Sequence, residues 1–281
     1  FATPEPIRKS MTQALEQGFT RYTATSGTPE IKAAVAAKFL RDQGLQIDPA
    51  QVVISWGAKH SLYNLFQALV NPGDDVLIPN PFWVSYPEMV HLAGGNPVLV
   101  ETSRNGYHMT ADLIERALTP KTKLVVLTSP SNPTGAVLSR QEITAIADLL
   151  VRRGLYAISD EIYEYYVYDG REHVSVAQII GKNWSDHVAI VNGVSKSYAM
   201  TGLRIGYSAT SLKLARAMGM LQDHSTSNPV TLSQKGAITA LAFGDDYVRQ
   251  LKAQFEAKRN RILELAKQIP QLDPLTAVGA A

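Results

Sequence analysis

The 281-residue sequence contains no cysteine, and it has neither a long apolar run nor a strong excess of charge of one sign. Without cysteine the chain forms no disulfide, offers no thiolate nucleophile and builds no cysteine-ligated zinc site. No stretch approaches the ~20 apolar residues of a membrane-spanning helix, and no signal peptide is visible. We therefore expect a protein of a reducing compartment, the cytoplasm, with no membrane partner.

The charge balance and the motif inventory exclude further classes of protein. The formal net charge is only +2, which gives no electrostatic reason to expect a nucleic-acid partner. A basic run at Lys258, Arg259 and Arg261 is interpreted as a solvated helix face. The six histidines are scattered without the spacing of ligands, so no metal site is predicted. The sequence also lacks a G-x-G-x-x-G fingerprint, a Walker loop and an H-E-x-x-H motif.

Helical patterns alternate with short apolar runs, which is typical of a layered α/β fold. The stretch from Thr28 to Gly44 shows the helical pattern, with a capping hydroxyl, a proline in the first turn and a closing glycine. In the clearest strand–helix–strand unit, Ser139 and Glu142 form a capping box. The predicted strands are 52–54, 76–78, 124–127, 156–159, 188–191 and 205–208. We expect a large α/β domain with a mostly parallel central sheet flanked by helices.

A long helix is predicted over residues 245–269, where apolar residues recur on one face. Since such a helix after an α/β core often bridges to a second domain, we place the domain boundary at its start. Residues 1–245 are expected to form the large domain, with 1–20 as an N-terminal segment. Residues 246–281 are expected to form the linking helix and the start of a small C-terminal domain. The sequence does not begin with methionine and stops within a continuing segment, so we expect both natural ends to be missing.

Reactive or conformationally special residues follow the predicted strands. In largely parallel sheets, ligands bind beyond the carboxyl ends of the strands. At these places the sequence supplies an aromatic ring, an amide, a carboxylate, a phenol and an amine. They occur in the segments Pro79–Trp83, Ser129–Gly135, Asp160–Tyr163 and Asn192–Ser197.

From these residues the chain resembles the fold-type I, class I pyridoxal-phosphate aminotransferases. It is most similar to their bacterial aspartate aminotransferase branch, which includes aspartate–prephenate aminotransferases. The similarity extends from Tyr22 to about Leu263 and rests on the motifs Ser129–Gly135, Ser159–Tyr163 and Asn192–Tyr207. The resemblance implies the large pyridoxal-phosphate transferase domain and parts of the small domain. It also implies amino-group transfer between an amino acid and a 2-oxo acid.

The resemblance implies that Lys196 holds pyridoxal 5'-phosphate as a Schiff base and later moves a proton, for which a buried, easily deprotonated amine is suited. Asp160 would face the pyridine nitrogen and keep it protonated. An aspartate at a strand end is by itself more often a helix cap, but its neighbours favour the catalytic role. Tyr163 and Asn132 would hydrogen-bond the phenolic oxygen, although Asn132 also suits a turn. Trp83 would stack on the ring.

The same resemblance implies a phosphate site and a backbone feature. Backbone donors at a helix N-terminus, with cationic and hydroxyl partners, suit a phosphate group. The residues expected there are Gly57, Ala58, Lys59, Ser195 and Arg204. The family's X-Pro bonds that match Asn80-Pro81 and Asn132-Pro133 are commonly cis.

Tyr22 resembles a tyrosine that reaches the phosphate of the neighbouring subunit, which implies a homodimer with shared active sites. Lys59 matches a lysine linked to the distal carboxylate of dicarboxylic substrates, with Trp83 and Asn132 also beside the substrate. This favours aspartate or glutamate, with oxaloacetate, 2-oxoglutarate or prephenate as the oxo acid. The alternative for Lys59 is a phosphate-loop cation that serves any substrate. The arginine for the substrate α-carboxylate is expected in the small domain, beyond this sequence.

Two other functions remain open at this point. The same cofactor residues serve other class I enzymes, such as an aromatic or alanine aminotransferase or a carbon–sulfur lyase, and cannot separate them. The remaining alternative is a non-catalytic aminotransferase-like sensor domain, for which the sequence supplies no DNA-binding motif.

Overall fold

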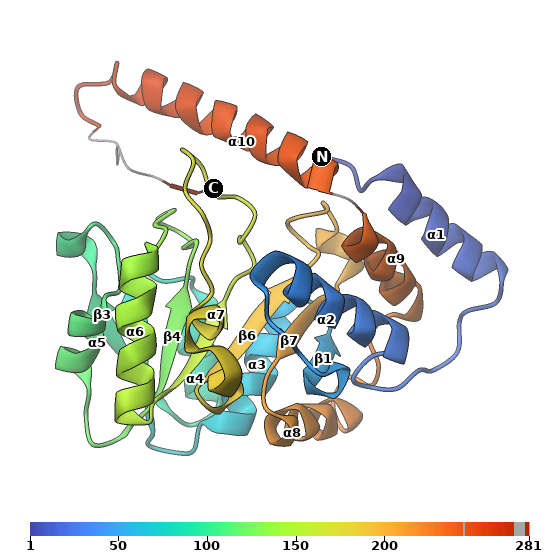
Figure 1. The fold of residues 1–281 in the computed structure, drawn as a ribbon, viewed down its shortest axis with the longest axis horizontal. Helices are drawn as coiled ribbons and strands as arrows, with labels where there is room; N and C mark the ends of the chain where they lie inside the picture. The colour runs from blue at the N-terminus through green and yellow to red at the C-terminus, as the bar shows by residue number, and fades with distance from the viewer. Residues whose placement is uncertain (244, 273–278, 281) are drawn as a thin grey trace.

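The computed structural model describes residues 1–243, 245–272 and 279–280. In this part of the chain, seven strands form one sheet in the order β1-β7-β6-β5-β4-β2-β3 (Figure 1). Of these, β7 is antiparallel to both of its neighbours, and the remaining neighbours pair in parallel. The strands are β1 (Val52–Ser55), β2 (Asp75–Asn80), β3 (Asn96–Glu101), β4 (Thr122–Thr128), β5 (Tyr156–Asp160), β6 (Val188–Gly193) and β7 (Gly206–Ala209). The expected mostly parallel sheet flanked by helices is confirmed.

Helices pack on both faces of this sheet (Figure 1). The helices are α1 (Glu5–Glu16), α2 (Pro29–Gln43), α3 (Ala58–Leu69), α4 (Ser85–Leu92), α5 (Ala111–Ala117), α6 (Arg140–Arg153), α7 (Val176–Ile180), α8 (Leu212–Asp223), α9 (Thr231–Ala242) and α10 (Asp245–Ala266). Short 3-10 turns lie at Pro49–Gln51, Ser103–Asn105, Gly181–Asp186 and Thr201–Leu203.

The alternation of side chains along each strand explains why both faces are covered. In β4, Val125 and Leu127 pack into one apolar cluster with α2 and α6, whereas Leu124 and Val126 pack into a second cluster with α3 and α4. Because successive side chains point to opposite faces, a strand buried on both sides must be apolar at every position. This is why the strands appear in the sequence as continuous apolar runs.

The caps of α6 form as predicted. The Glu142 amide donates to Ser139 Oγ at 3.3 Å, and the Ser139 amide donates to Glu142 Oε2 at 2.8 Å. Gly154 ends the helix in the left-handed conformation, with φ of 61°. The capping box therefore fixes the start of α6 at Arg140, a few residues after the Ser129–Gly135 loop, and Gly154 fixes its end.

The N-terminal segment contains a helix that the sequence analysis did not predict. Residues 5–16 form α1, which packs on α9 and buries Ile7 and Ala14. Tyr22 follows α1 and is 87% exposed.

The long helix α10 is confirmed, but its apolar face is only half covered. Val248 and Leu251 are buried, whereas Ile262 is 65% and Leu265 is 43% exposed. The expectation of a solvated basic face is wrong for Arg259, whose guanidinium lies 2.6 Å from Asp169 Oδ1 with a side chain only 11% exposed. Among the described residues, no helix is both long and apolar enough to cross a membrane.

The capping box gives a stability prediction. Replacing Ser139 by alanine removes the acceptor for the Glu142 amide and should lower the free energy of unfolding by about 0.5–2 kcal/mol. Urea denaturation followed by circular dichroism measures the change. The control is Thr144→Ala on the same helix, whose exposed hydroxyl bonds only its own helix, to the Arg140 carbonyl. Equal losses in the two variants would contradict the assigned role of the cap.

Candidate active site

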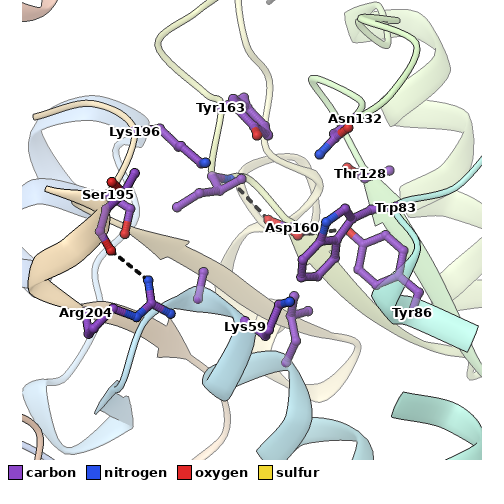
Figure 2. Close-up of a pocket in the computed structure, with 14 residues that line it drawn as sticks. Lys59, Trp83, Tyr86, Thr128, Asn132, Asp160, Tyr163, Ser195, Lys196 and Arg204 are labelled. Atoms are coloured by element: carbon purple, nitrogen blue, oxygen red, sulfur yellow. Dashed lines mark hydrogen bonds between the residues drawn. The ribbon is translucent and has the colours of Figure 1, made fainter. Parts of the chain in front are cut away.

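A cavity of about 200 Å³ lies at the carboxyl ends of the parallel strands (Figure 2). Its position agrees with the expectation that ligands of a parallel sheet bind beyond the carboxyl ends of the strands, which we call the strand-end rule. The predicted residues that line it are Ala58, Lys59, Trp83, Asn132, Asp160, Tyr163, Ser195, Lys196 and Arg204.

Asp160 ends β5 and places a buried carboxylate in this cavity, with only 5% of the residue exposed. Burial raises the pKa of Asp160 to about 6, although hydrogen bonds from Tyr86 and Ile162 act in the opposite direction. The Tyr86 hydroxyl donates to Asp160 Oδ2 at 2.7 Å, and the Ile162 amide donates to Oδ1 at 3.2 Å. These two donors hold the carboxylate in one orientation.

Lys196 and Tyr163 lie across the cavity from the Trp83 side, as Figure 2 shows. Lys196 Nζ is 5.8 Å from the centre of the Tyr163 ring. Burial and the nearby Asp160 charge raise the pKa of Tyr163, whereas a hydrogen bond with Asn132 lowers it. Both expected cis peptide bonds, Asn80-Pro81 and Asn132-Pro133, are present.

The opposite end of the cavity is a close-packed turn between β1 and α3. Gly57 has a φ of 87°, and a Cβ placed on it would lie 2.5 Å from Arg204 Nη2. A Cβ on Gly206 would lie 2.1 Å from the Ala58 nitrogen. The absence of side chains at these two glycines lets β7 and Arg204 approach the first turn of α3. Arg204 is held there by bonds from its guanidinium to the carbonyl oxygens of Thr201 at 2.9 Å and Trp56 at 3.2 Å.

The charges around the cavity are unequal. Lys59, Lys196 and Arg204 supply three cations against the single carboxylate of Asp160. The first amides of α3 have no carbonyl partner within the helix, and they add positive potential at the same end. The cavity is therefore suited to a ligand with several anionic groups.

An aromatic wall completes the cavity. The Trp83 and Tyr86 rings meet edge to face, with centres 5.3 Å apart, and Lys59 Nζ lies 4.9 Å from the Trp83 ring centre. An aromatic face beside a buried acid and an amine can hold a planar ring between them. A second cavity of about 420 Å³ adjoins this one past Lys196 and Asn132, with Tyr166 and Phe255 in its wall.

Two predicted residues do not line the cavity. Gly57 packs against the Arg204 guanidinium, and its lack of a side chain makes room for that group. Tyr22 projects into solvent from the segment after α1.

The structure also adds residues that the sequence analysis missed. Tyr86 lies in the first turn of α4, and its amide donates to the Trp83 carbonyl oxygen at 3.0 Å, which brings the two residues together. Thr128 is the last residue of β4, so the strand-end rule could have found it, and it lines the cavity together with Tyr86. Leu62, Ile162 and Thr201 complete the wall.

Comparisons with known proteins agree with this geometry. The family model for class I and II aminotransferases matches residues 1–276. An aspartate aminotransferase of Geobacillus stearothermophilus is 43% identical over the whole chain, which covers 71% of that protein. An aspartate/prephenate aminotransferase of Cereibacter sphaeroides is 42% identical over 95% of the chain and 67% of its own length. The crystal structure of the aspartate aminotransferase of Rhizobium meliloti superposes with a TM-score of 0.93 at 38% identity, covering 96% of this chain and 68% of that one. The chain belongs to the class I and II aminotransferases.

Proposed function

We propose that this chain binds pyridoxal 5'-phosphate and transfers the amino group of aspartate or glutamate to a 2-oxo acid. The observation that carries the proposal is that Lys196 and Asp160 face one cavity, with the Trp83 ring beside them and a cationic helix terminus at the far end. The names of the aspartate aminotransferases that the chain resembles support the choice of substrate. They favour transamination over a carbon–sulfur lyase or a sensor domain.

The residues present fit this cofactor. The turn held open by Gly57 and Gly206 brings the amides of α3 and the Arg204 guanidinium to one place, where a phosphate needs donors. In our proposal, Ala58, Lys59 and Ser195 add donors there. The cavity beyond has an aromatic wall for a ring and a buried acid for a ring nitrogen.

When bound, pyridoxal phosphate supplies an aldehyde that condenses with amines and a pyridine ring that withdraws electrons. Asp160 would accept a hydrogen bond from the ring nitrogen and hold a proton on that atom. The positive charge formed there favours the carboxylate form of Asp160 over the neutral form that burial promotes. Tyr86 assists because its hydroxyl donates to the carboxylate.

Lys196 has two proposed tasks. Its amine would hold the cofactor covalently before substrate arrives, and once displaced it would take the proton from the substrate Cα and deliver it to cofactor C4'. Tyr163 and Asn132 would donate to the phenolic oxygen from the same side of the cavity. Both side chains line the cavity, and Asn132 is close enough to Tyr163 to lower its pKa before any ligand binds.

We also propose a homodimer and a second domain. Tyr22 is 87% exposed, which suits a side chain that reaches the phosphate of a partner subunit. The exposed Ile262 and Leu265 suit a helix whose far half is covered by a small domain that begins within residues 246–281. Both features would close the active site from outside the large domain.

The cofactor linkage is tested by trapping. With pyridoxal phosphate added, we expect an absorbance band that borohydride removes, and a cofactor-labelled Lys196 peptide by mass spectrometry. Adding aspartate before borohydride should prevent labelling and release oxaloacetate. Lys196→Ala should abolish the label, whereas the control Lys59→Ala should keep it. Label on another lysine contradicts the cofactor site, and labelled Lys196 without oxaloacetate contradicts the reaction.

The Tyr86 contact predicts a pH effect. In Tyr86→Phe the Asp160 carboxylate loses a donor, so its pKa should rise above the present value of about 6. Less Asp160 is then ionised at a given pH, and the acid limb of cofactor binding should move to higher pH. Quenching of tryptophan fluorescence in the apoprotein measures the affinity against pH. Tyr63→Phe, a partly exposed tyrosine of α3 outside the cavity, is the control and should leave the profile unchanged.

The dicarboxylate role of Lys59 predicts a change in selectivity. A charge-assisted hydrogen bond to the distal carboxylate stabilises the complex by about 1.5–3 kcal/mol. Lys59→Ala should therefore lower the ratio of kcat/KM for aspartate over phenylalanine by about 10- to 100-fold. If Lys59 serves only the phosphate, kcat/KM falls equally for both amino acids and the ratio stays constant. The exposed Lys121→Ala is the control.

A further inference from the structure

The turn that follows β5 has two functional sides. Asp160 and Tyr163 face the proposed cofactor cavity. Glu161 and Glu164 lie between and beside them in sequence, but they point away from the cavity and are 1% and 6% exposed. Two buried acids directly behind the catalytic turn have no part in the mechanism above.

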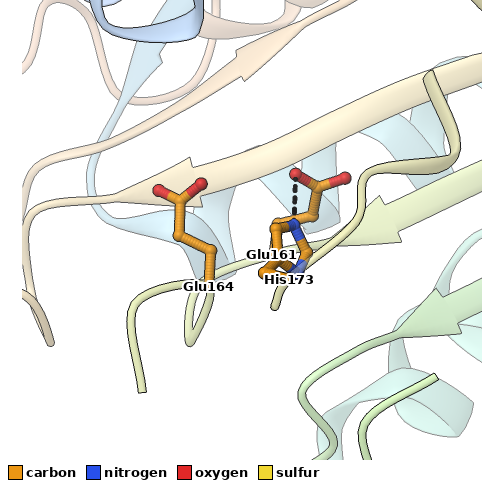
Figure 3. A group of neighbouring side chains, drawn as sticks. All are labelled: Glu161, Glu164 and His173. Atoms are coloured by element: carbon orange, nitrogen blue, oxygen red, sulfur yellow. Dashed lines mark hydrogen bonds and ion pairs between the residues drawn. The ribbon is translucent and has the colours of Figure 1, made fainter. Parts of the chain in front are cut away.

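Both carboxylates are fully occupied by protein donors. Glu164 receives Lys38 Nζ at 2.5 Å and 2.6 Å on its two oxygens, with Asn192 at 2.8 Å and Gln43 at 3.1 Å. The donors to Glu161 are Gln43 at 2.8 Å, Ser159 at 3.0 Å, Ser175 at 2.6 Å and the His173 ring at 3.2 Å (Figure 3). We call Glu161, Glu164 and the side chains that donate to them the anchor network.

The anchor network is a poor metal site despite its composition. Glu161, Glu164 and His173 bring their ligand atoms within 4.8 Å of one another. However, each carboxylate oxygen already accepts two hydrogen bonds, and Lys38 already supplies a cation. A metal ion would have to displace these donors and would meet the repulsion of the ammonium group.

The network joins the turn after β5 and the end of β6, which lead to site residues, to helix α2, which supplies none. Lys38 and Gln43 lie on α2, whereas Glu161 and Glu164 lie on the turn after β5. Asn192 is at the end of β6, directly before the loop that carries Lys196. Moving any of these elements would break bonds to a buried charge, which is costly because the charge has no water to replace its partner.

Stability alone does not account for this arrangement. A buried ion pair can often be replaced by neutral residues with no loss of stability, because the desolvation of two charges offsets their attraction. What a neutral pair lacks is the charge-assisted hydrogen bonding of an ammonium to a carboxylate, which is about twice as strong as a neutral hydrogen bond. In this chain the hydrogen bonds of the network tie the turn after β5 to α2 and to the end of β6.

We propose that Lys38, through Glu164, is a positioning residue that holds Asp160 and Tyr163 in place for the reaction. The proposal rests on the function proposed above. Lys38 touches neither cofactor nor substrate: it acts from behind the turn, through the chain segment that the acids and the catalytic residues share.

The test is the double variant Lys38→Met/Glu164→Gln, measured with pyridoxal phosphate bound. It removes both charges and keeps an acceptor for Asn192. We expect kcat for aspartate to fall about 10- to 100-fold, as for a small misplacement of catalytic groups, with KM within about twofold. In the apoprotein, the amides of Ile162 and Glu164 should exchange with deuterium faster than in the parent. Lys32→Met, a half-buried lysine of the same helix that bonds Ser26, is the control and should match the parent.

The outcomes separate the two proposals. If the double variant keeps its fold by circular dichroism and has the same kcat and exchange rates as the parent protein, the positioning role is overturned. If the double variant does not fold, Glu164→Gln alone is measured in the same way, and parental kcat and exchange overturn the role. A parent protein that forms no oxaloacetate contradicts the proposed function instead, and the exchange rates of the apoprotein still decide whether Lys38 holds the turn.

Discussion

The site is arranged around one buried carboxylate, that of Asp160. Removal from water favours the neutral acid, and its pKa is raised to about 6 as a result. The proposed role requires the anion, so the surroundings must restore part of what water would supply. Tyr86 and the Ile162 amide do this as donors, and a protonated ring nitrogen would complete it. An acid so placed is a strong partner for a cation that arrives, because no water competes with it.

The direction of β7 explains how the cationic end of the cavity comes to face this acid. Lys196 follows β6, and Arg204 precedes β7. Because β7 runs against β6, the start of β7 lies at the same edge of the sheet as the end of β6. The loop between them can therefore supply an amine and a guanidinium without crossing the sheet. Gly206 then lets β7 pack on the first turn of α3, which adds the helix amides to the same edge.

Much of this could be predicted from the sequence, because the strand-end rule needs only the order of strands and polar residues. It located Asp160, Asn132 and Lys196, and the capping-box pattern located the start of α6. The strand-end rule could not give the reversed direction of β7, since a strand segment of four residues carries no sign of direction. Nor could it find the anchor network, because Lys38 and Glu164 are 126 positions apart and only the packed fold brings them together.

The two central residues of the site differ in freedom, and this difference fits their proposed tasks. Asp160 is held at both oxygens, and the turn that carries it is anchored from behind. The Lys196 backbone is also held, since Tyr166 donates to its carbonyl oxygen at 2.7 Å. Its amine, however, has no hydrogen-bond acceptor among the described residues and extends into the cavity on a flexible side chain. A group that orients a ring must stay in place, whereas a group that carries a proton between two atoms must move. The fold provides both by fixing the backbone of each residue and leaving only the lysine side chain free.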